Sequence, residues 1–212
     1  MKPHVLITAG PTREYIDPVR YLSNDSSGKM GFALAAAAQK RGALVTLIAG
    51  PVQLASPPNV RRIDVISAEE MRAQTLQIAP EADFIIMAAA VADFSPKKIS
   101  ANKIKRAKTP SSALTITLQE NPDILAELAN NKTPQQTLLG FALETTELEK
   151  NAKKKLAQKN CDWIVANDAS AINAEHSAVT LFAKNGSKLT LAKNSKQRLA
   201  EQILEIILKN TK

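Results

Sequence analysis

One stretch of the sequence combines residue types that can hold a phosphate group. Residues 23–31 read Ser-Asn-Asp-Ser-Ser-Gly-Lys-Met-Gly and stand directly before an alanine-rich segment with helical character. Free backbone amides and the positive end of the helix dipole favour an anion at such a helix start. The stretch is not a P-loop, because Met30 follows Lys29, and it lacks the first glycine of the dinucleotide fingerprint. It therefore indicates either an anion cradle or an ordinary capped helix start.

Further along the chain, residues 94–113 form a basic segment without a single acidic residue. Its cations are Lys97, Lys98, Lys103, Lys105, Arg106 and Lys108. The segment follows the most apolar strand of the chain, which favours a lid that closes over anions, although a solvated loop has the same composition. Lys155 and Lys159 are four residues apart, hence neighbours on one helix face. They are either the polar rim of that helix or two further charges for a polyphosphate.

Several apolar runs that we expect to be strands end in small or acidic residues, namely 8–11, 88–93, 140–144 and 166–168. Three of them carry a carboxylate just after the apolar run: Asp93, Glu144 and Asp168. Ligands of open parallel sheets bind beyond the carboxyl ends of the strands, where the strand order reverses. Each segment alone could be a plain turn, but together they predict one cleft.

The composition excludes several other kinds of site. Cys161 is the only cysteine and His4 and His176 are the only histidines, which argues against an internal disulfide, a zinc cluster and a nucleophilic triad. The formal net charge is +8 and only 4% of residues are aromatic, so phosphorylated small molecules are favoured over nucleic acid. Reactions that depend on positioning and charge neutralisation remain, with phosphoryl or nucleotidyl transfer leading.

The elements that must position these residues alternate between strand and helix. We expect strands at 5–9, 44–49, 61–66, 83–90, 114–118, 137–142 and 162–166, and helices at 30–41, 67–79, 146–159 and 195–209, with one more opening at 121–123. Ser67–Glu70 and Thr146–Glu149 match capping boxes, and Asn185-Gly186 indicates a hairpin. This pattern predicts an α/β fold: a Rossmann-like, doubly wound, mainly parallel sheet flanked by helices, with a small antiparallel extension.

The chain is expected to be one domain over residues 1–212, because no linker or internal repeat interrupts it. No apolar run approaches the roughly 20 residues of a membrane span, and no signal-peptide pattern opens the chain. We expect no membrane partner and a cytoplasmic location.

Taken together, the motifs resemble one family. They are Ile7–Glu14, Asp17–Gly31, Ala88–Phe94, Lys103–Lys105, Asn121–Ile124, Gly140–Ala142 and Ala166–Asp168, in order along nearly the whole chain. This set resembles phosphopantothenoylcysteine synthetase, the phosphopantothenate–cysteine ligase of coenzyme A biosynthesis, in its bacterial CTP-dependent form. Asp17–Gly31 is the most specific piece. In that family the bacterial enzyme is usually fused to a flavin-dependent phosphopantothenoylcysteine decarboxylase, so the chain either stands alone or is one half of such a protein.

The resemblance implies a two-step ligation of 4′-phosphopantothenate to L-cysteine, helped by Mg²⁺, through an acyl-cytidylate made from CTP with release of pyrophosphate and CMP. It implies a homodimer as well. By resemblance, Arg20 and Asn24 bind the pantothenate substrate, Asn24 holding or polarising the acyl group, and Asn24 and Lys103 are catalytic. The nucleotide-binding residues implied in the same way are Met87, Ala88, Ala89, Asp93, Lys103, Pro122, Asp123, Ile124, Leu125, Phe141, Lys155 and Lys159. The metal ligands are left open.

Two other functions remain in competition. A nicotinamide-dependent (NAD(P)) oxidoreductase could use a similar sheet, although the glycine fingerprint is absent and no Tyr-x-x-x-Lys pair is evident. A nucleic-acid-binding module would fit the basic charge. The choice of CTP over ATP follows from the resemblance and from no physical rule.

Overall fold

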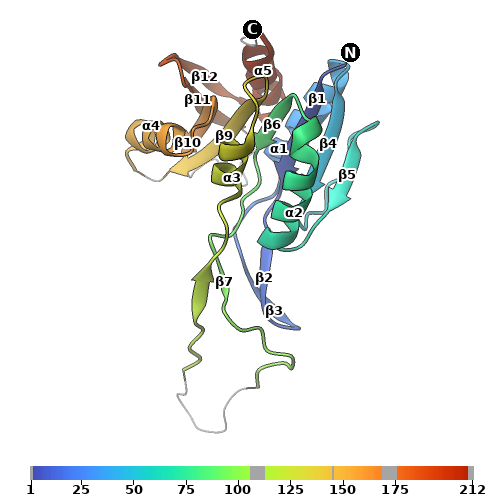
Figure 1. The fold of residues 1–212 in the computed structure, drawn as a ribbon, viewed down its shortest axis with the longest axis vertical. Coiled ribbons are helices and arrows are strands. Elements are labelled where there is room, and N and C mark those ends of the chain that lie inside the picture. The colour runs from blue at the N-terminus through green and yellow to red at the C-terminus, as the bar shows by residue number, and fades with distance from the viewer. Residues whose placement is uncertain (1, 106–112, 145, 169–175, 210–212) are drawn as a thin grey trace.

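Six parallel strands form the centre of an eight-stranded sheet in the computed structural model, which describes residues 2–105, 113–144, 146–168 and 176–209 (Figure 1). In spatial order they are β5 (Arg61–Asp64), β4 (Leu44–Ala49), β1 (His4–Ala9), β6 (Phe84–Met87), β9 (Thr137–Glu144) and β10 (Trp163–Asp168). The chain builds outward from β1 in one direction and then from β6 in the other. This order confirms the doubly wound fold and places the switch point between β1 and β6.

The antiparallel extension is confirmed at the other end of the sheet. There, β11 (His176–Ala183) pairs antiparallel with β10 and with β12 (Lys188–Ser195). The turn between β11 and β12 contains Gly186 at φ 89°, a left-handed conformation that glycine adopts without steric cost. The Asn185-Gly186 signal therefore predicted the hairpin correctly.

Helices cover both faces of the sheet. Apolar residues of α1 (Lys29–Lys40) and α5 (Lys196–Lys209) share one core with Val5 and Ile7 of β1, whereas α2 (Ala68–Ile78), α3 (Ile124–Asn131) and α4 (Leu148–Gln158) share the opposite core with Leu6. A short 3₁₀ helix, η1 (Ala79–Glu81), follows α2. Consecutive residues of β1 thus point into different cores, which explains why the central strands are apolar at nearly every position.

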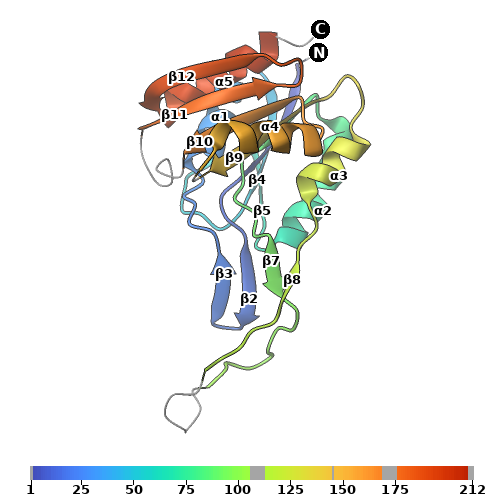
Figure 2. The same cartoon turned by 90° about the vertical axis from the view of Figure 1, so that its left-hand side faces the viewer.

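Two extensions leave the carboxyl-end side of the sheet (Figure 2). The ribbon consists of β2 (Arg13–Asp17) and β3 (Arg20–Ser23), and the arm consists of residues 94–105 and 113–120 with β7 (Phe94–Pro96) and β8 (Leu118–Glu120). Sequence analysis missed the ribbon and wrongly placed a strand at 114–118. Among the described residues, strand pairing in the arm covers 94–96 with 118–120, and one further hydrogen bond, from the Lys97 N–H to the Thr117 carbonyl at 3.0 Å, continues it.

Some of the predicted helix starts are confirmed and others are wrong. The Ser67 side chain caps α2 by accepting from the Glu70 N–H, and the Glu70 carboxylate accepts from the Ile66 N–H, one residue before the Ser67 N–H that a standard capping box uses. Ser195 likewise accepts from the Arg198 N–H at the start of α5.

The predicted capping box at Thr146–Glu149 is wrong. The helix begins at Leu148 behind Glu147, which has φ 48° and makes no capping hydrogen bond but pairs with Lys150. The helix expected to open at 121–123 is capped by the Asp123 side chain, which accepts from the Ala126 N–H, and Pro122 precedes that cap.

The start of α1 lies directly against the end of β1, and Gly31 makes this contact possible. A Cβ atom at position 31 would come within 2.4 Å of the Ala9 Cβ and 3.1 Å of the Thr8 carbonyl oxygen. The closeness of the two elements sets where the α1 start stands relative to the strand ends.

We expect Gly31→Ala to destabilise the fold by about 1–3 kcal/mol, because overpacking outweighs the roughly 1 kcal/mol gained in helix propensity. Thermal unfolding would measure the change. Gly42→Asn is the matched control, since Gly42 lies at φ +83° with no atom within 4 Å and asparagine tolerates that conformation. An alanine variant as stable as the wild type would contradict the close contact.

Candidate functional site

A cleft with two adjoining pockets lies at the switch point, beyond the carboxyl ends of β1, β6 and β9. The α3 pocket, of about 550 Å³, is lined by Met87, Ala89, residues 91–94, residues 120–125, Phe141, Lys155 and Lys159. The α1 pocket, of about 480 Å³, is lined by residues 24–31, residues 88–91, Asp93, Phe141, Leu143, Lys155, Asn167, Ser177 and Lys196. The two pockets share Ala89, Val91, Asp93, Phe141 and Lys155, so they form one continuous site.

Most of the residues implied by the sequence motifs meet in this cleft. The α3 pocket brings together Met87, Ala89, Asp93, Pro122, Asp123, Ile124, Leu125, Phe141, Lys155 and Lys159. Asn24 and Ala88 line the α1 pocket beside them. Arg20 and Lys103 are absent from the described lining of both pockets.

The cations of the α3 pocket are held by oxygen atoms on neighbouring elements. Lys159, which follows α4, forms an ion pair with Asp123 at the start of α3, and the Lys155 Nζ donates to the Phe141 carbonyl at 2.8 Å. Burial tends to raise the pKa of the Asp123 carboxyl, but hydrogen bonds from Lys159 and the Ala126 N–H, with the charges of both lysines, hold that pKa below its ordinary value. These contacts fix both ammonium groups at the pocket wall rather than on a solvated rim.

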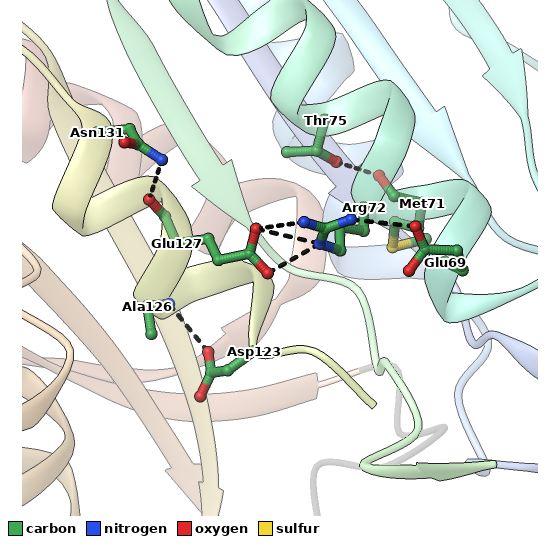
Figure 3. Close-up of polar contacts among 8 residues, drawn as sticks. All are labelled: Glu69, Met71, Arg72, Thr75, Asp123, Ala126, Glu127 and Asn131. Atoms are coloured by element: carbon green, nitrogen blue, oxygen red, sulfur yellow. Dashed lines mark hydrogen bonds and ion pairs between the residues drawn. The ribbon is translucent and has the colours of Figure 1, made fainter. Parts of the chain in front are cut away.

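Helix α3 is itself anchored to α2 through an arginine bridge (Figure 3). The Arg72 Nε and Nη2 donate to the two oxygens of Glu127 at 2.8 Å each, and Nη1 donates to Glu69 at 3.0 Å. The two carboxylates raise the pKa of Arg72, although burial opposes them. A bidentate pair of this geometry is directional, so it fixes where the amino end of α3 meets the pocket.

The segment after β6 is held by hydrogen bonds from both sides of the cleft. The Ala90 N–H donates to the Gly10 carbonyl at 2.9 Å, the Ala92 N–H donates to the Thr12 hydroxyl at 3.0 Å, and Asn121 Nδ2 donates to the Ala92 carbonyl at 2.9 Å. Small side chains and a fixed backbone leave room for a ligand to approach closely.

Asn24 completes that framework. Its Nδ2 donates to the carbonyls of Ala90 and Val91, at 3.2 and 3.0 Å. Both amide hydrogens are thereby engaged, and because no donor among the described residues reaches Oδ1, that atom can accept a hydrogen bond from a ligand. The geometry connects the loop before α1 with the strand end of β6.

Arg20 and Lys103 lie instead where the ribbon meets the arm, and Asp17 joins these two extensions. The buried Asp17 carboxylate accepts from Arg20 Nη1 at 2.9 Å and from the Ile104 N–H at 3.0 Å, while Arg20 Nη2 donates to the Ile104 carbonyl at 2.8 Å. The Ile104 N–H is the largest influence that lowers the pKa of Asp17, aided by the Val19 and Arg20 N–H groups and the Arg20 charge against the opposing effect of burial. Sequence reasoning missed this role of Asp17; the only signal was its three-residue spacing from Arg20.

The remaining predicted groups add little to the described site. Asp93 lines both pockets, whereas the Glu144 and Asp168 side chains, with Arg106 and Lys108, lie outside the described residues. Within the described ranges, no group of three His, Cys, Asp or Glu side chains could by itself enclose a metal ion. Cys161 is a buried free thiol, and burial raises its pKa to about 12, which is typical of an unreactive cysteine. No helix among the described residues is long and apolar enough to cross a bilayer.

Comparisons with known proteins converge on one family. The model of the DNA/pantothenate metabolism flavoprotein C-terminal domain matches residues 1–211. The coenzyme A biosynthesis bifunctional protein CoaBC of Haemophilus influenzae is 49% identical over 207 residues, covering 96% of this chain and 51% of that protein. The Escherichia coli K12 protein of the same name is 45% identical over 209 residues, covering 97% and 51%. The chain thus spans about half the length of these relatives.

Solved structures agree with the sequence comparison. The crystal structure of the C-terminal domain of a CoaBC protein matches with a TM-score of 0.84 and 40% identity, covering 97% of this chain and 93% of that one. A Cab2 variant in complex with phosphopantothenate-cysteine has a TM-score of 0.82 at 18% identity, over 99% of this chain and 86% of that one, which shows the shared fold.

We expect Asp17→Asn to loosen the contact between ribbon and arm. The measurement is amide hydrogen exchange at Ile104, which should become faster while exchange in β1 stays unchanged. Because the folded-state pKa of Asp17 is lowered, its stabilising effect is fully present above the unfolded pKa of about 3.9 and is lost as pH falls through the folded value. The difference in melting temperature between wild type and variant should therefore be constant from pH 7 to 5 and shrink below pH 4; a difference that is unchanged at low pH would contradict the ionised anchor.

Proposed function

The chain belongs to the family of the DNA/pantothenate metabolism flavoprotein C-terminal domain, and on this premise we propose that it is a phosphopantothenate–cysteine ligase. It joins 4′-phosphopantothenate to L-cysteine, using CTP and releasing pyrophosphate and CMP. Two findings support this: the relatives are named as coenzyme A biosynthesis proteins, and the Cab2 variant of the same fold binds phosphopantothenate-cysteine.

The proposed reaction has two displacements. The substrate carboxylate attacks the α-phosphorus of CTP, forming an acyl-cytidylate as the bond to pyrophosphate breaks. The cysteine amine then attacks the acyl carbon, the bond to CMP breaks, and the ammonium proton is lost. Activation is necessary because a carboxylate oxygen is a poor leaving group. Both reactants of the first step are anions, so the site has to offset their repulsion.

One observation carries the proposal: the α3 and α1 pockets meet at Phe141 and Lys155. In the α3 pocket, the backbone at the start of α3 reads the base, the Phe141 ring packs on it, and Lys155 and Lys159 neutralise phosphates. The acyl group is held beside Asn24 in the α1 pocket. Because Nδ2 of Asn24 is engaged by two carbonyls, we assign its Oδ1 the contact with the substrate and the rest of the side chain the positioning of residues 90–91.

The residues also fit a magnesium ion carried by the nucleotide. Mg²⁺ keeps several waters and is bound by one or two carboxylates together with substrate phosphates, and Asp93 stands where the two pockets join. When bound, the ion would neutralise phosphate charge. Asp93 would hold and orient it, and the lysines would supply the rest of the positive charge.

We propose further that the active form is a homodimer. Arg20 and Lys103 lie outside the described cleft lining of their own chain, and the extensions that carry them expose apolar side chains suited to a protein contact. These are Val19 and Tyr21 on the ribbon and Phe94, Ile99, Leu114 and Leu118 on the arm. A second copy would bury them and bring Arg20 and Lys103 to the cleft of its neighbour.

The proposal extends to the surroundings of the protein. Because the chain spans half of relatives described as bifunctional, we propose a phosphopantothenoylcysteine decarboxylase as its fusion or functional partner. A cytoplasmic location would keep the thiol substrate and product reduced.

The decisive assay measures pyrophosphate release from CTP with Mg²⁺, 4′-phosphopantothenate and cysteine. We expect release that depends on both the acid and the nucleotide, and hydroxylamine in place of cysteine should trap the acyl-cytidylate. Parallel reactions with ATP, GTP and UTP test the preference for CTP. Absence of release with every nucleotide would refute the ligase.

Mixing two inactive variants tests the shared site. Asn24→Asp replaces the donor to two carbonyls by a carboxylate, and Lys103→Gln removes a charge from the arm, so each homodimer should lose most of its activity. If the arm reaches the partner's cleft, each mixed dimer contains one intact site, and an equal mixture should regain about a quarter of wild-type activity after subunit exchange. No recovery, with exchange verified by mass spectrometry, would place both residues in the same chain's site.

A further inference from the structure

Helix α3 is short and follows the arm directly, so its position depends on its neighbours. It has eight residues, Ile124–Asn131, and only residues 121–123 separate it from β8. An isolated helix of this length is unstable in water, so packing and side-chain contacts must hold it. Its first two residues, Ile124 and Leu125, line the α3 pocket. A displacement of the helix start would therefore change the shape of that pocket.

Apolar packing and two ion pairs hold α3 between α2 and α4 (Figure 1). The apolar side chains that it buries in the core shared with these helices are Ile124, Leu128 and Ala129. Toward α4, Asp123 pairs with Lys159, and toward α2, Glu127 pairs with Arg72. Apolar packing is not directional, whereas charge-assisted hydrogen bonds are. The two ion pairs therefore determine how the start of α3 is turned toward the pocket.

A ligand in the cleft would affect these two ion pairs differently. Asp123 and Lys159 both line the α3 pocket, so a bound phosphate would share the Lys159 ammonium and weaken its contact with Asp123. Arg72 and Glu127 are absent from the described lining of both pockets. Their contact is bidentate, with Arg72 Nε and Nη2 each 2.8 Å from a Glu127 oxygen. The Arg72–Glu127 pair is thus the polar anchor of α3 that remains while the cleft is occupied.

Arg72 stands on a helix that is itself firmly held. The neighbouring Met71 is fully buried, and the Glu14 carboxylate of the ribbon accepts from the Ala68 N–H in the first turn of α2 at 2.9 Å. Arg72 Nη1 also donates to Glu69 on its own helix at 3.0 Å (Figure 3). The guanidinium is therefore oriented from α2 toward α3.

We propose that Arg72 is a positioning residue for the nucleotide, because through Glu127 it holds the first turn of α3 where the backbone can read the base. The inference rests on the proposed function, which assigns recognition of the base to the start of α3. Arg72 does not touch the nucleotide. Its effect falls on the base more than on the phosphates, since Lys155 is held by a carbonyl of β9 rather than by α3.

Calorimetry with CTP and with tripolyphosphate, both with Mg²⁺, separates these two parts of the nucleotide. Arg72→Met removes the guanidinium and retains an unbranched stem. It should weaken CTP binding roughly fivefold, the size expected for a well-formed ion pair at a partly exposed site, and leave tripolyphosphate binding unchanged. Equal weakening of both ligands would indicate a general loss of positive charge and would overturn the proposal. A lower melting temperature with unchanged CTP affinity would show a purely structural role and would overturn it too.

Two carboxylate variants show which partner of Arg72 matters. Glu127→Gln should weaken CTP binding by the same factor as Arg72→Met, and the double variant should be no weaker, because both changes break one contact. Glu69→Gln is the matched control: it removes a carboxylate that contacts the same guanidinium but belongs to α2, so CTP affinity should be unchanged. Additive losses in the double variant, or an equal loss in the Glu69 variant, would contradict the role of the pair.

Failure of the proposed function gives a different result from failure of this inference. A wild-type chain that does not bind CTP would refute the ligase, and the inference with it. A wild-type chain that binds CTP as tightly as its Arg72 and Glu127 variants do would refute the inference alone.

Discussion

The reversal of strand order between β1 and β6 is the constraint on which the site depends. Because the chain winds outward from these two neighbours in opposite directions, the segments that follow them cover different faces of the sheet and leave a cleft between them. Gly31 lets α1 stand against the end of β1, and the hydrogen bonds to residues 90–92 hold the end of β6 opposite. The cleft is therefore built largely from backbone, which explains why small residues dominate its floor.

Positive charge in the cleft is positioned before any ligand arrives. Lys159 is held by Asp123 and Lys155 by a carbonyl, so two flexible side chains of the cleft have already lost much of their conformational freedom in the folded chain. Outside the cleft, Asp17 holds Arg20 in the same way. Cations fixed in this way stabilise developing charge better than mobile ones, because little reorganisation is needed during the reaction. Partners such as a carbonyl oxygen can also share the ammonium group with a phosphate rather than neutralise it permanently.

The sequence predicted the parallel strands, their alternation with helices and the cleft at their carboxyl ends. Continuous apolar runs indicate strands that are buried on both faces, and Gly-Pro pairs mark where such strands end. The ribbon and the strand of the arm could not be predicted, since alternation at 114–118 says nothing about whether a neighbouring strand exists. Helical spacing put Lys155 and Lys159 on one face without deciding between rim and cleft. Ser177 gave no signal at all: a serine in an alternating strand is ordinary until its surroundings show an unpaired hydroxyl.

The division of the cleft into two pockets bears on how two anions can react. A single cluster of cations would bind both reactants in competition, since each would seek the same charges. Here Lys159 lies on the α3 side and Lys196 on the α1 side, while Lys155 borders both. If the phosphates of the two reactants are held at these separate ends, the middle of the cleft, beside Ala89 and Phe141, is the place where a carboxylate and a phosphorus atom can approach. Because the cations are spaced apart, they can orient the two reactants as well as neutralise their charge. Orientation contributes more to a displacement between bound reactants than added attraction would.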